Sequence, residues 1–240
     1  MNVFTRLITY LLLCSGISVA STNFSIKNLS DIPSYERYEF NASGTTLENT
    51  KVIIEYTLVN RGTDSASWII KGSMPINGLF IEEEYTVRLR DLNVVSSKRK
   101  QSFKKGYSET NSEYSVDIKT NDPGEFIIST FQGLMYLLRT FPINSSVKAI
   151  DVYMAQQATE KIGIHVRNKG EKSITTPLYG TVSATELHVA VAIPLVGGFL
   201  PNVNYYFRND PARTLVGMKG AFSMTGKKMD VLLVKHIIKK

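Results

Sequence analysis

Three histidines are the residues most able to support acid–base or metal chemistry. His165 lies at a polar position of an alternating segment, His188 follows Glu186 on the same strand face, and His236 is close to the carboxyl terminus. No two of them have the spacing of zinc ligands, and no His-Glu-x-x-His pattern occurs. Glu186 and His188 could form an acid–base pair, although such neighbours more often make a simple polar contact.

Other catalytic patterns are missing from the sequence. It contains no Gly-x-Ser-x-Gly elbow, no phosphate-binding loop and no dinucleotide glycine motif. Glu82, Glu83 and Glu84 form an acidic run without the spaced oxygen ligands of a calcium loop, which favours a solvated strand start. We therefore expect no catalytic residue, no cofactor and no metal site. The alternative is a hydrolase that lacks a recognisable motif and uses an acidic residue with His165 or His188.

A basic segment offers a different kind of chemistry. It surrounds Phe103 and consists of Lys98, Arg99, Lys100, Lys104 and Lys105. Each basic residue near an anionic membrane surface contributes about 1 kcal/mol of attraction. The segment therefore suggests contact with an anionic lipid or glycan, and its alternative interpretation is a solvated hairpin loop.

An apolar segment follows an expected buried strand. The run from 189 to 200 is interrupted by Pro194 and by Gly197-Gly198, so its second part is expected to be a loop. The apolar residues of that loop need a burial partner. They could cap the core, line the mouth of an apolar ligand cavity, or form a partner surface. As ligand-binding candidates we take Leu195, Val196, Phe199 and Leu200.

The elements that must position these residues are mainly strands. Apolar and polar residues alternate over 52–59, 84–90, 114–119, 161–167, 187–193, 203–207 and 229–234. This period is typical of antiparallel sheets that are covered on one face. About ten strands are expected, with a chain reversal at Asn168-Lys169-Gly170. The predicted fold is mostly β, a curved antiparallel sheet forming a half-barrel or sandwich, with one short helix packed on it.

The helix is predicted between Ser129 and Arg139. Apolar residues recur there at helical spacing, Ser129 and Gln132 form a capping box, and Pro142 prevents continuation. Gly133 weakens a helix by about 1 kcal/mol relative to alanine. The segment should therefore be stable only when packed against the sheet.

The amino-terminal segment resembles an export signal. Arg6 precedes an uncharged run from 7 to 20 that ends in Ser18-Val19-Ala20, so cleavage is expected after Ala20. The alternatives are an uncleaved anchor, for which the run is short, and lipidation at Cys14, where Leu13 stands in place of the small residue required. The predicted organisation is a signal peptide over 1–20, a polar leader over 21–33 and one β-rich domain over 34–240.

Composition narrows the partners. Cys14 is the only cysteine, so the mature chain would contain no disulfide and no thiolate. The formal net charge of +7 favours anionic lipids or glycans. Because the chain is expected to be exported, nucleic acid is not an expected partner. We expect a protein that is soluble or peripheral to a membrane, in the periplasm or, alternatively, secreted.

The carboxyl-terminal two thirds resembles the bacterial family called domain of unknown function 3108. The similarity lies in 134–139, in Ile162 to Val166 with Gly170 and 177–180, and in the segments 205–207, 213–216 and 231–232. It covers about residues 50–236. The resemblance implies a Gram-negative envelope protein with a curved half-barrel sheet, and it implies no activity or site residues. The basic segment at 98–105 departs from the family pattern.

These observations favour an exported, non-catalytic protein of the cell envelope. Its one-sided sheet would shelter an apolar groove for a lipid or another apolar envelope component. The alternative is an interaction or assembly factor that pairs with an envelope protein through an exposed sheet edge.

Overall fold

The computed structural model describes residues 32–44, 51–76, 79–90, 94–103, 112–116, 126–128, 134–141, 149–154, 161–191, 202–221 and 228–240. The expected signal peptide and most of the expected leader lie outside these ranges. Of the leader, Ile32 is buried in the hydrophobic core. None of the described helices is long and apolar enough to cross a membrane.

Thirteen strands account for most of the described residues. They are β1 (Tyr35–Ser43), β2 (Lys51–Val59), β3 (Ser67–Ile76), β4 (Leu79–Arg88), β5 (Val94–Phe103), β6 (Ser112–Val116), β7 (Phe126–Ile128), β8 (Ala149–Met154), β9 (Lys161–Thr176), β10 (Gly180–Val191), β11 (Asn202–Arg208), β12 (Leu215–Gly220) and β13 (Met229–Lys239).

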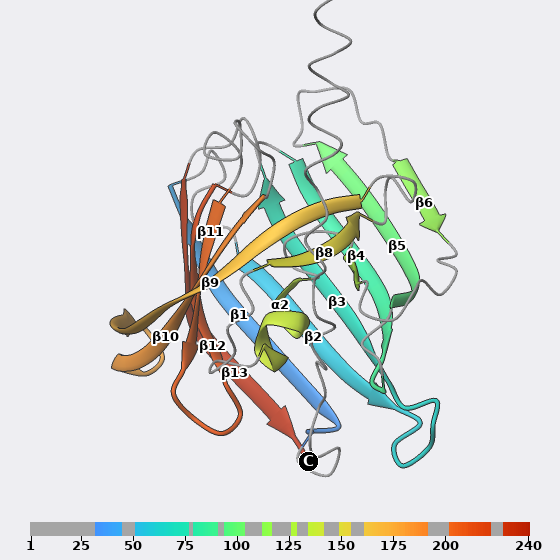
Figure 1. Cartoon of the computed structure of the whole chain (residues 1–240), viewed down its shortest axis with the longest axis horizontal. Helices are drawn as coiled ribbons and strands as arrows, with labels where there is room; N and C mark the ends of the chain where they lie inside the picture. Colours follow the sequence, from blue (N-terminus) through green and yellow to red (C-terminus); the bar gives the residue numbers. More distant parts are fainter. Residues whose placement is uncertain are drawn as a thin grey trace, which may run out of the picture.

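All thirteen strands belong to one sheet. Their order is β6-β5-β4-β3-β2-β1-β13-β12-β11-β10-β9-β8-β7, so the first strand pairs with the last. Every pairing is antiparallel except that of β7 with β8. Figure 1 shows the sheet curving around a concave interior. Among the described pairings none joins β6 to β7, so the sheet is a half-barrel and not a closed barrel.

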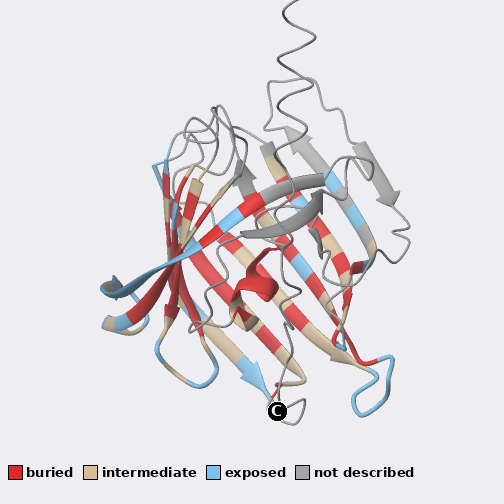
Figure 2. Ribbon diagram, in the orientation of Figure 1, coloured by how far each residue is buried: buried red, intermediate tan, exposed pale blue. Residues whose placement is uncertain are grey.

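Alternation along each strand creates the concave core. On β2, Val52, Ile54 and Tyr56 are buried, whereas the residues between them are partly exposed. Successive strand side chains point to opposite faces, so an apolar period of two fills one face of the sheet. Figure 2 shows the resulting alternation of buried and accessible positions along the strands. The predicted fold class, a mostly β curved antiparallel sheet with one short helix, is confirmed.

Helix α2 (Leu134–Thr140) lies against the concave face. Its first five residues are all buried, and the ring of Tyr136 contacts that of Tyr85 on β4 with centroids 6.3 Å apart. Seven residues are too few for a helix that is stable alone in water. The helix therefore depends on its contacts with the sheet, as predicted, and the proposed capping box at Ser129 lies outside the described residues.

The predicted chain reversal at Asn168-Lys169-Gly170 is wrong. Strand β9 continues through these residues to Thr176, and the chain turns at 177–179. The register with β10 slips between Thr185 and Leu187, which makes the segment a β-bulge. Gly170 has a φ of 89°, and its N–H donates to Asn168 Oδ1 at 2.8 Å. The turn-forming residues Asn168-Lys169-Gly170 therefore form a bulge within a long hairpin.

Candidate functional site

A charged residue faces the core from strand β1. Glu36 lies on the same inward side as Tyr38 and Phe40, and it is only 1% exposed. Burial of an ionised carboxylate is strongly unfavourable unless charged and hydrogen-bonding partners compensate for the lost water. Glu36 therefore identifies the place where the core must contain a polar network.

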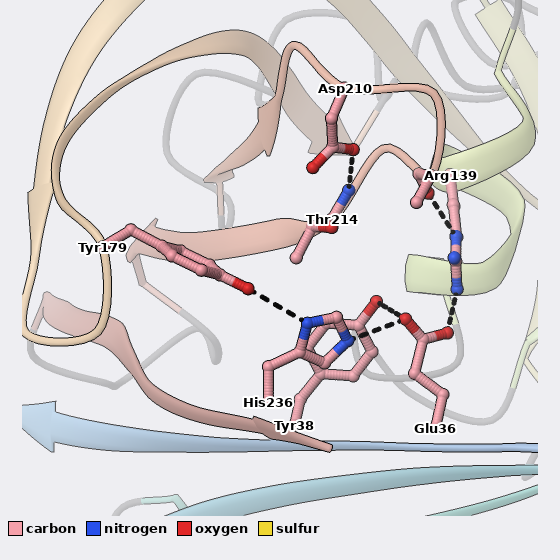
Figure 3. Close-up of polar contacts among 8 residues, drawn as sticks. Glu36, Tyr38, Arg139, Tyr179, Asp210, Thr214 and His236 are labelled. Carbon is pink, nitrogen blue, oxygen red and sulfur yellow. Dashed lines mark hydrogen bonds and ion pairs between the residues drawn. The ribbon is translucent and has the colours of Figure 1, made fainter. Parts of the chain in front are cut away.

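Arg139 in the last turn of α2 supplies the opposite charge. Its Nη1 donates to Glu36 Oε2, and its Nε donates to the carbonyl oxygen of Ala212 at 2.9 Å. Figure 3 shows the guanidinium beside the carboxylate of Glu36. A cation near a helix carboxyl terminus also interacts favourably with the helix dipole. One side chain thus joins α2 to β1 and to the loop between β11 and β12.

His236 and two tyrosines complete the network. His236 Nε2 lies 2.8 Å from Glu36 Oε1, and its Nδ1 lies 3.2 Å from the hydroxyl of Tyr179 at the tip of the β9–β10 hairpin. The Tyr38 hydroxyl donates to Glu36 Oε1 at 2.6 Å, and its ring stacks on the imidazole with centroids 4.5 Å apart. Four segments that are distant in sequence therefore meet in this network, three of them directly at Glu36.

The network determines the ionisation of Glu36. Burial raises the pKa of Glu36, but the hydrogen bond with His236, the charge of Arg139 and the hydrogen bond from Tyr38 outweigh it and lower the pKa to about 2. Burial raises the pKa of the Tyr38 hydroxyl well above its usual range. At neutral pH Glu36 is therefore a carboxylate and Tyr38 a neutral donor.

The geometry of this network suits a structural role. The side chains of Glu36, His236 and Arg139 are 2%, 5% and 15% exposed, and each bonds to protein groups. A general acid or base must come within hydrogen-bond reach of substrate, and these groups are turned towards one another. Among the described residues no cluster of three His, Cys, Asp or Glu side chains could hold a metal ion.

A second arginine strengthens the junction between α2 and the β11–β12 loop. Arg213 Nη1 donates to the carbonyl oxygen of Phe141, directly after the helix, while Arg139 of the helix donates to Ala212 of the loop. Within the loop, the N–H of Thr214 donates to Asp210 Oδ1 at 3.1 Å. The loop and the helix end therefore exchange two arginine–carbonyl hydrogen bonds.

The basic segment does not form the hairpin loop considered above. Lys98, Arg99 and Lys100 belong to β5, where the antiparallel register places them opposite Glu84, Glu83 and Glu82 of β4. Opposite charges in directly opposed positions stabilise a sheet. The acidic run likewise lies within β4 and not at a solvated strand start, and Glu83 is only 4% exposed. Lys104 and Lys105 lie outside the described residues, and contact with an anionic surface stays a prediction.

This charge pairing continues across the convex face of the sheet. Lys71 Nζ contacts Glu84 Oε2 at 2.9 Å, and Arg37 Nη1 contacts Glu55 Oε1 at 2.9 Å. A shallow pocket of about 360 Å³ opens here, lined by these side chains and by Gly72 and Lys100. Because cations and anions alternate along its walls, the described part of this face has no single-sign field.

The remaining candidate residues are not brought together. Leu195, Val196, Phe199 and Leu200 lie outside the described residues, so their role in ligand binding stays a prediction. His165 is exposed, and His188 Nδ1 lies 2.6 Å from Asn204 Oδ1. Glu186 instead contacts Lys172 Nζ at 2.5 Å. Glu186 and His188 therefore contact two different residues and do not form the suggested pair.

Sequence reasoning missed the network at Glu36. Its signal is a charged residue at an apolar position: Glu36 shares the inward period of Tyr38 and Phe40, and Arg139 lies four residues after the buried Met135 of the helix. Although His236 is close to the carboxyl terminus, it belongs to the ordered sheet, because β13 extends to Lys239 and pairs with β1.

No protein-family model matches the chain, and no curated protein does. Among solved structures, a β-barrel-like protein of domain of unknown function 1849 from Brucella abortus is similar with a TM-score of 0.48 and 9% identity, over 87% of this chain and 98% of that one. A candidate lipoprotein from Parabacteroides distasonis has a TM-score of 0.34 and 11% identity, covering 86% and 97% of the two chains. A candidate exported protein with a YmcC-like fold from Bacteroides fragilis has a TM-score of 0.28 and 11% identity, covering 84% and 95%. Membership of domain of unknown function 3108 stays a prediction.

Proposed function

We propose that this chain is an exported, non-catalytic protein of the bacterial cell envelope and that its curved sheet shelters a lipid or another apolar ligand. The observation that carries the proposal is the apolar concave face of the half-barrel, over which α2 contributes only seven residues. A seven-residue helix is about 10 Å long. Small ligands bind preferentially in concave, mostly apolar sites, among them the interiors and mouths of β-barrels.

Two further observations support a binding role without catalysis. The ionisable groups that converge in the described core, Glu36, Arg139 and His236, bond to one another and are turned away from solvent. The sequence before residue 21 has the pattern of an export signal, which would deliver the mature chain to a lipid-rich compartment.

The test is retention of ligand by variants of the apolar segment. The wild type, Phe199→Asp and the control Leu178→Asp would be purified from an envelope fraction, and their organic extracts quantified per mole of protein. Leu178 is a suitable control because it is an exposed apolar residue in the β9–β10 turn, 38% exposed. We expect Phe199→Asp to lose most of the extractable lipid and Leu178→Asp to keep it. Equal lipid in all three samples would contradict a site at this segment.

One observation favours the alternative of an assembly factor. Strand β8 pairs with β9 only over Lys161–His165, whereas β10 pairs with β9 as far as Thr176. Within the described ladder, residues 166–176 therefore have a neighbouring strand on one side only, and such an edge can accept an extended segment of a partner. An assembly factor would co-purify with a defined protein at equal yield from the wild type and from Phe199→Asp.

A further inference from the structure

Arg213, in the loop between β11 and β12, has an unfilled hydrogen-bonding edge. Its Nη1 donates to the carbonyl oxygen of Phe141, but its Nε and Nη2 are buried and have no acceptor among the described residues. The N–H groups of Nε and Nη2 lie along the same side of the planar guanidinium. That side binds carboxylates and phosphates through two parallel hydrogen bonds. The geometry of the free edge is thus complementary to an oxyanion.

The charge of Arg213 is also uncompensated in the described structure. Arg139 is neutralised by Glu36, whereas the one carboxylate of the Arg213 loop, Asp210, accepts from the N–H of Thr214 and lies 3.7 Å from Nε of Arg208. Burial and the neighbouring charge of Arg139 lower the pKa of Arg213 to about 10. Arg213 is therefore a half-buried cation at neutral pH whose Nε and Nη2 are fully buried, and it lies beside a second cation that is already paired with Glu36.

The backbone holds Arg213 in this position at a conformational cost. Its φ is 50°, in the left-handed region that residues with a side chain rarely adopt, and its N–H donates to the carbonyl oxygen of Asp210 at 3.0 Å. Such conformations persist where the surrounding structure imposes them, and they concentrate at functional sites. Here the conformation allows the side chain to reach the end of α2.

The guanidinium also has an apolar neighbour on one face. It lies over the ring of Phe207 with its central carbon 5.4 Å from the ring centroid, and both Phe207 and Phe141 are 1% exposed. A cation beside apolar side chains is complementary to an anionic amphiphile. The anionic group would bind Arg213, and the alkyl chain would lie along the neighbouring core. Since Nε and Nη2 are buried, entry of the anion requires a local displacement of the groups that cover them.

We propose that Arg213 binds the oxyanion of an anionic amphiphile, a carboxylate or a phosphate ester, at the carboxyl-terminal end of α2. The inference rests on the proposed function and assigns the ligand's polar end. It concerns residues that are separate from the apolar segment 195–200 and from the basic run on β5.

The experiment is a binding titration of the mature chain with four probes. Dodecyl phosphate and dodecanoate combine an anion with a chain, dodecyl maltoside has the chain without the charge, and inorganic phosphate has the anion without the chain. Each is used below its micelle-forming concentration. We expect the two anionic amphiphiles to bind roughly tenfold or more tightly than the maltoside. The ratio of dodecyl phosphate to dodecanoate affinity distinguishes a phosphate ester from a fatty acid as the natural head group.

Three variants at arginine positions complete the test. Arg213→Gln should reduce the preference for anionic amphiphiles to within about twofold of the maltoside, and Arg213→Lys should leave part of it, because lysine keeps the charge but lacks the two-pronged edge. Arg208→Gln is the matched control, since Arg208 is a loop-flanking arginine with a 41% exposed side chain, and it should bind like the wild type. If Arg213→Gln does not fold, the Arg213→Lys result decides.

The outcomes separate the two proposals. Equal binding of all three dodecyl probes, unchanged in Arg213→Lys and Arg213→Gln, overturns the oxyanion site and leaves the apolar site standing. Phosphate bound as tightly as dodecyl phosphate, and lost in Arg213→Gln, supports the oxyanion site and overturns the apolar one. Binding of none of the four probes overturns both.

Discussion

Glu36 and Arg139 form a buried ion pair that joins β1 to α2 across 103 positions of sequence. The same carboxylate accepts from Tyr38 and is bonded to His236 of β13, so the first strand, the last strand and the helix depend on one side chain. Because β1 and β13 are adjacent in the sheet, the contact fixes α2 at the centre of the strand order.

Replacing Glu36 by glutamine should destabilise the fold strongly. Removing one partner of a buried ion pair leaves an uncompensated charge and typically costs about 3–5 kcal/mol. The matched control is Glu84→Gln, whose carboxylate pairs with Lys71 on the exposed face and should contribute about 1 kcal/mol or less. Urea unfolding of the three proteins measures the difference. Equal losses in the two variants would show that Arg139 does not depend on Glu36.

Acid should weaken the fold through the same residue. The folded pKa of Glu36 is lowered to about 2 from 4.5, so its contribution is complete above pH 4.5 and is lost as the pH falls towards 2. A shift of this size corresponds to roughly 3 kcal/mol. Unfolding free energies measured at intervals between pH 6 and pH 2.5 should fall more steeply in the wild type than in Glu36→Gln. Parallel curves would exclude Glu36 as the source of acid sensitivity.

Tyr179→Phe should loosen the tip of the β9–β10 hairpin. The change removes the hydroxyl that contacts His236 Nδ1 at 3.2 Å but keeps the ring under the Arg208 guanidinium. We expect a loss of about 1 kcal/mol and faster amide hydrogen exchange in residues 174–182. Leu178→Ala serves as the control, because Leu178 is exposed and should leave the exchange unchanged. Unaltered exchange in Tyr179→Phe would mean that the hydroxyl does not hold the hairpin.

Reversing one charge of the β4–β5 pairing should destabilise the fold, and reversing its partner as well should restore part of the stability. Glu84 lies opposite Lys98 and contacts Lys71, so Glu84→Lys places three lysines on adjacent strands and should destabilise by roughly 1 kcal/mol at low salt. Adding Lys98→Glu should recover part of that loss, and 1 M salt should reduce both effects. A double variant as unstable as the single one would refute the pairing of the acidic and basic runs.

The architecture could be predicted from the sequence because it depends on a local signal. Alternation in segments such as 52–59 specifies a one-faced strand, and the helical spacing of Leu134, Met135 and Leu138 specifies a helix that needs a sheet to cover. Both patterns arise from burial, which acts residue by residue. The strand order is not local, and the pairing of β1 with β13 has no counterpart in any short motif.

The polar network could not be predicted for the same reason. Glu36, Arg139, Tyr179 and His236 come from four distant segments, and the one local signal, a charged residue at an inward position of β1, does not identify its partners. The basic run could be recognised from its composition, but its position in the fold could not be predicted. Its partner is the acidic run on β4, and only the register of the β4–β5 hairpin brings the two runs together. Arg213 had no distinguishing sequence feature, because its left-handed φ and its unfilled guanidinium edge are properties of the folded loop.

The central claim is tested most directly by the mass of the mature chain purified from its own cell envelope, recorded under native and then denaturing conditions. The proposed function predicts a native mass that exceeds the denatured mass by one lipid-sized ligand, which an organic extract then identifies. The separate proposal for Arg213 adds that this ligand carries a carboxylate or a phosphate. Identical native and denatured masses, with no lipid in the extract, would contradict the binding role and favour the interaction factor.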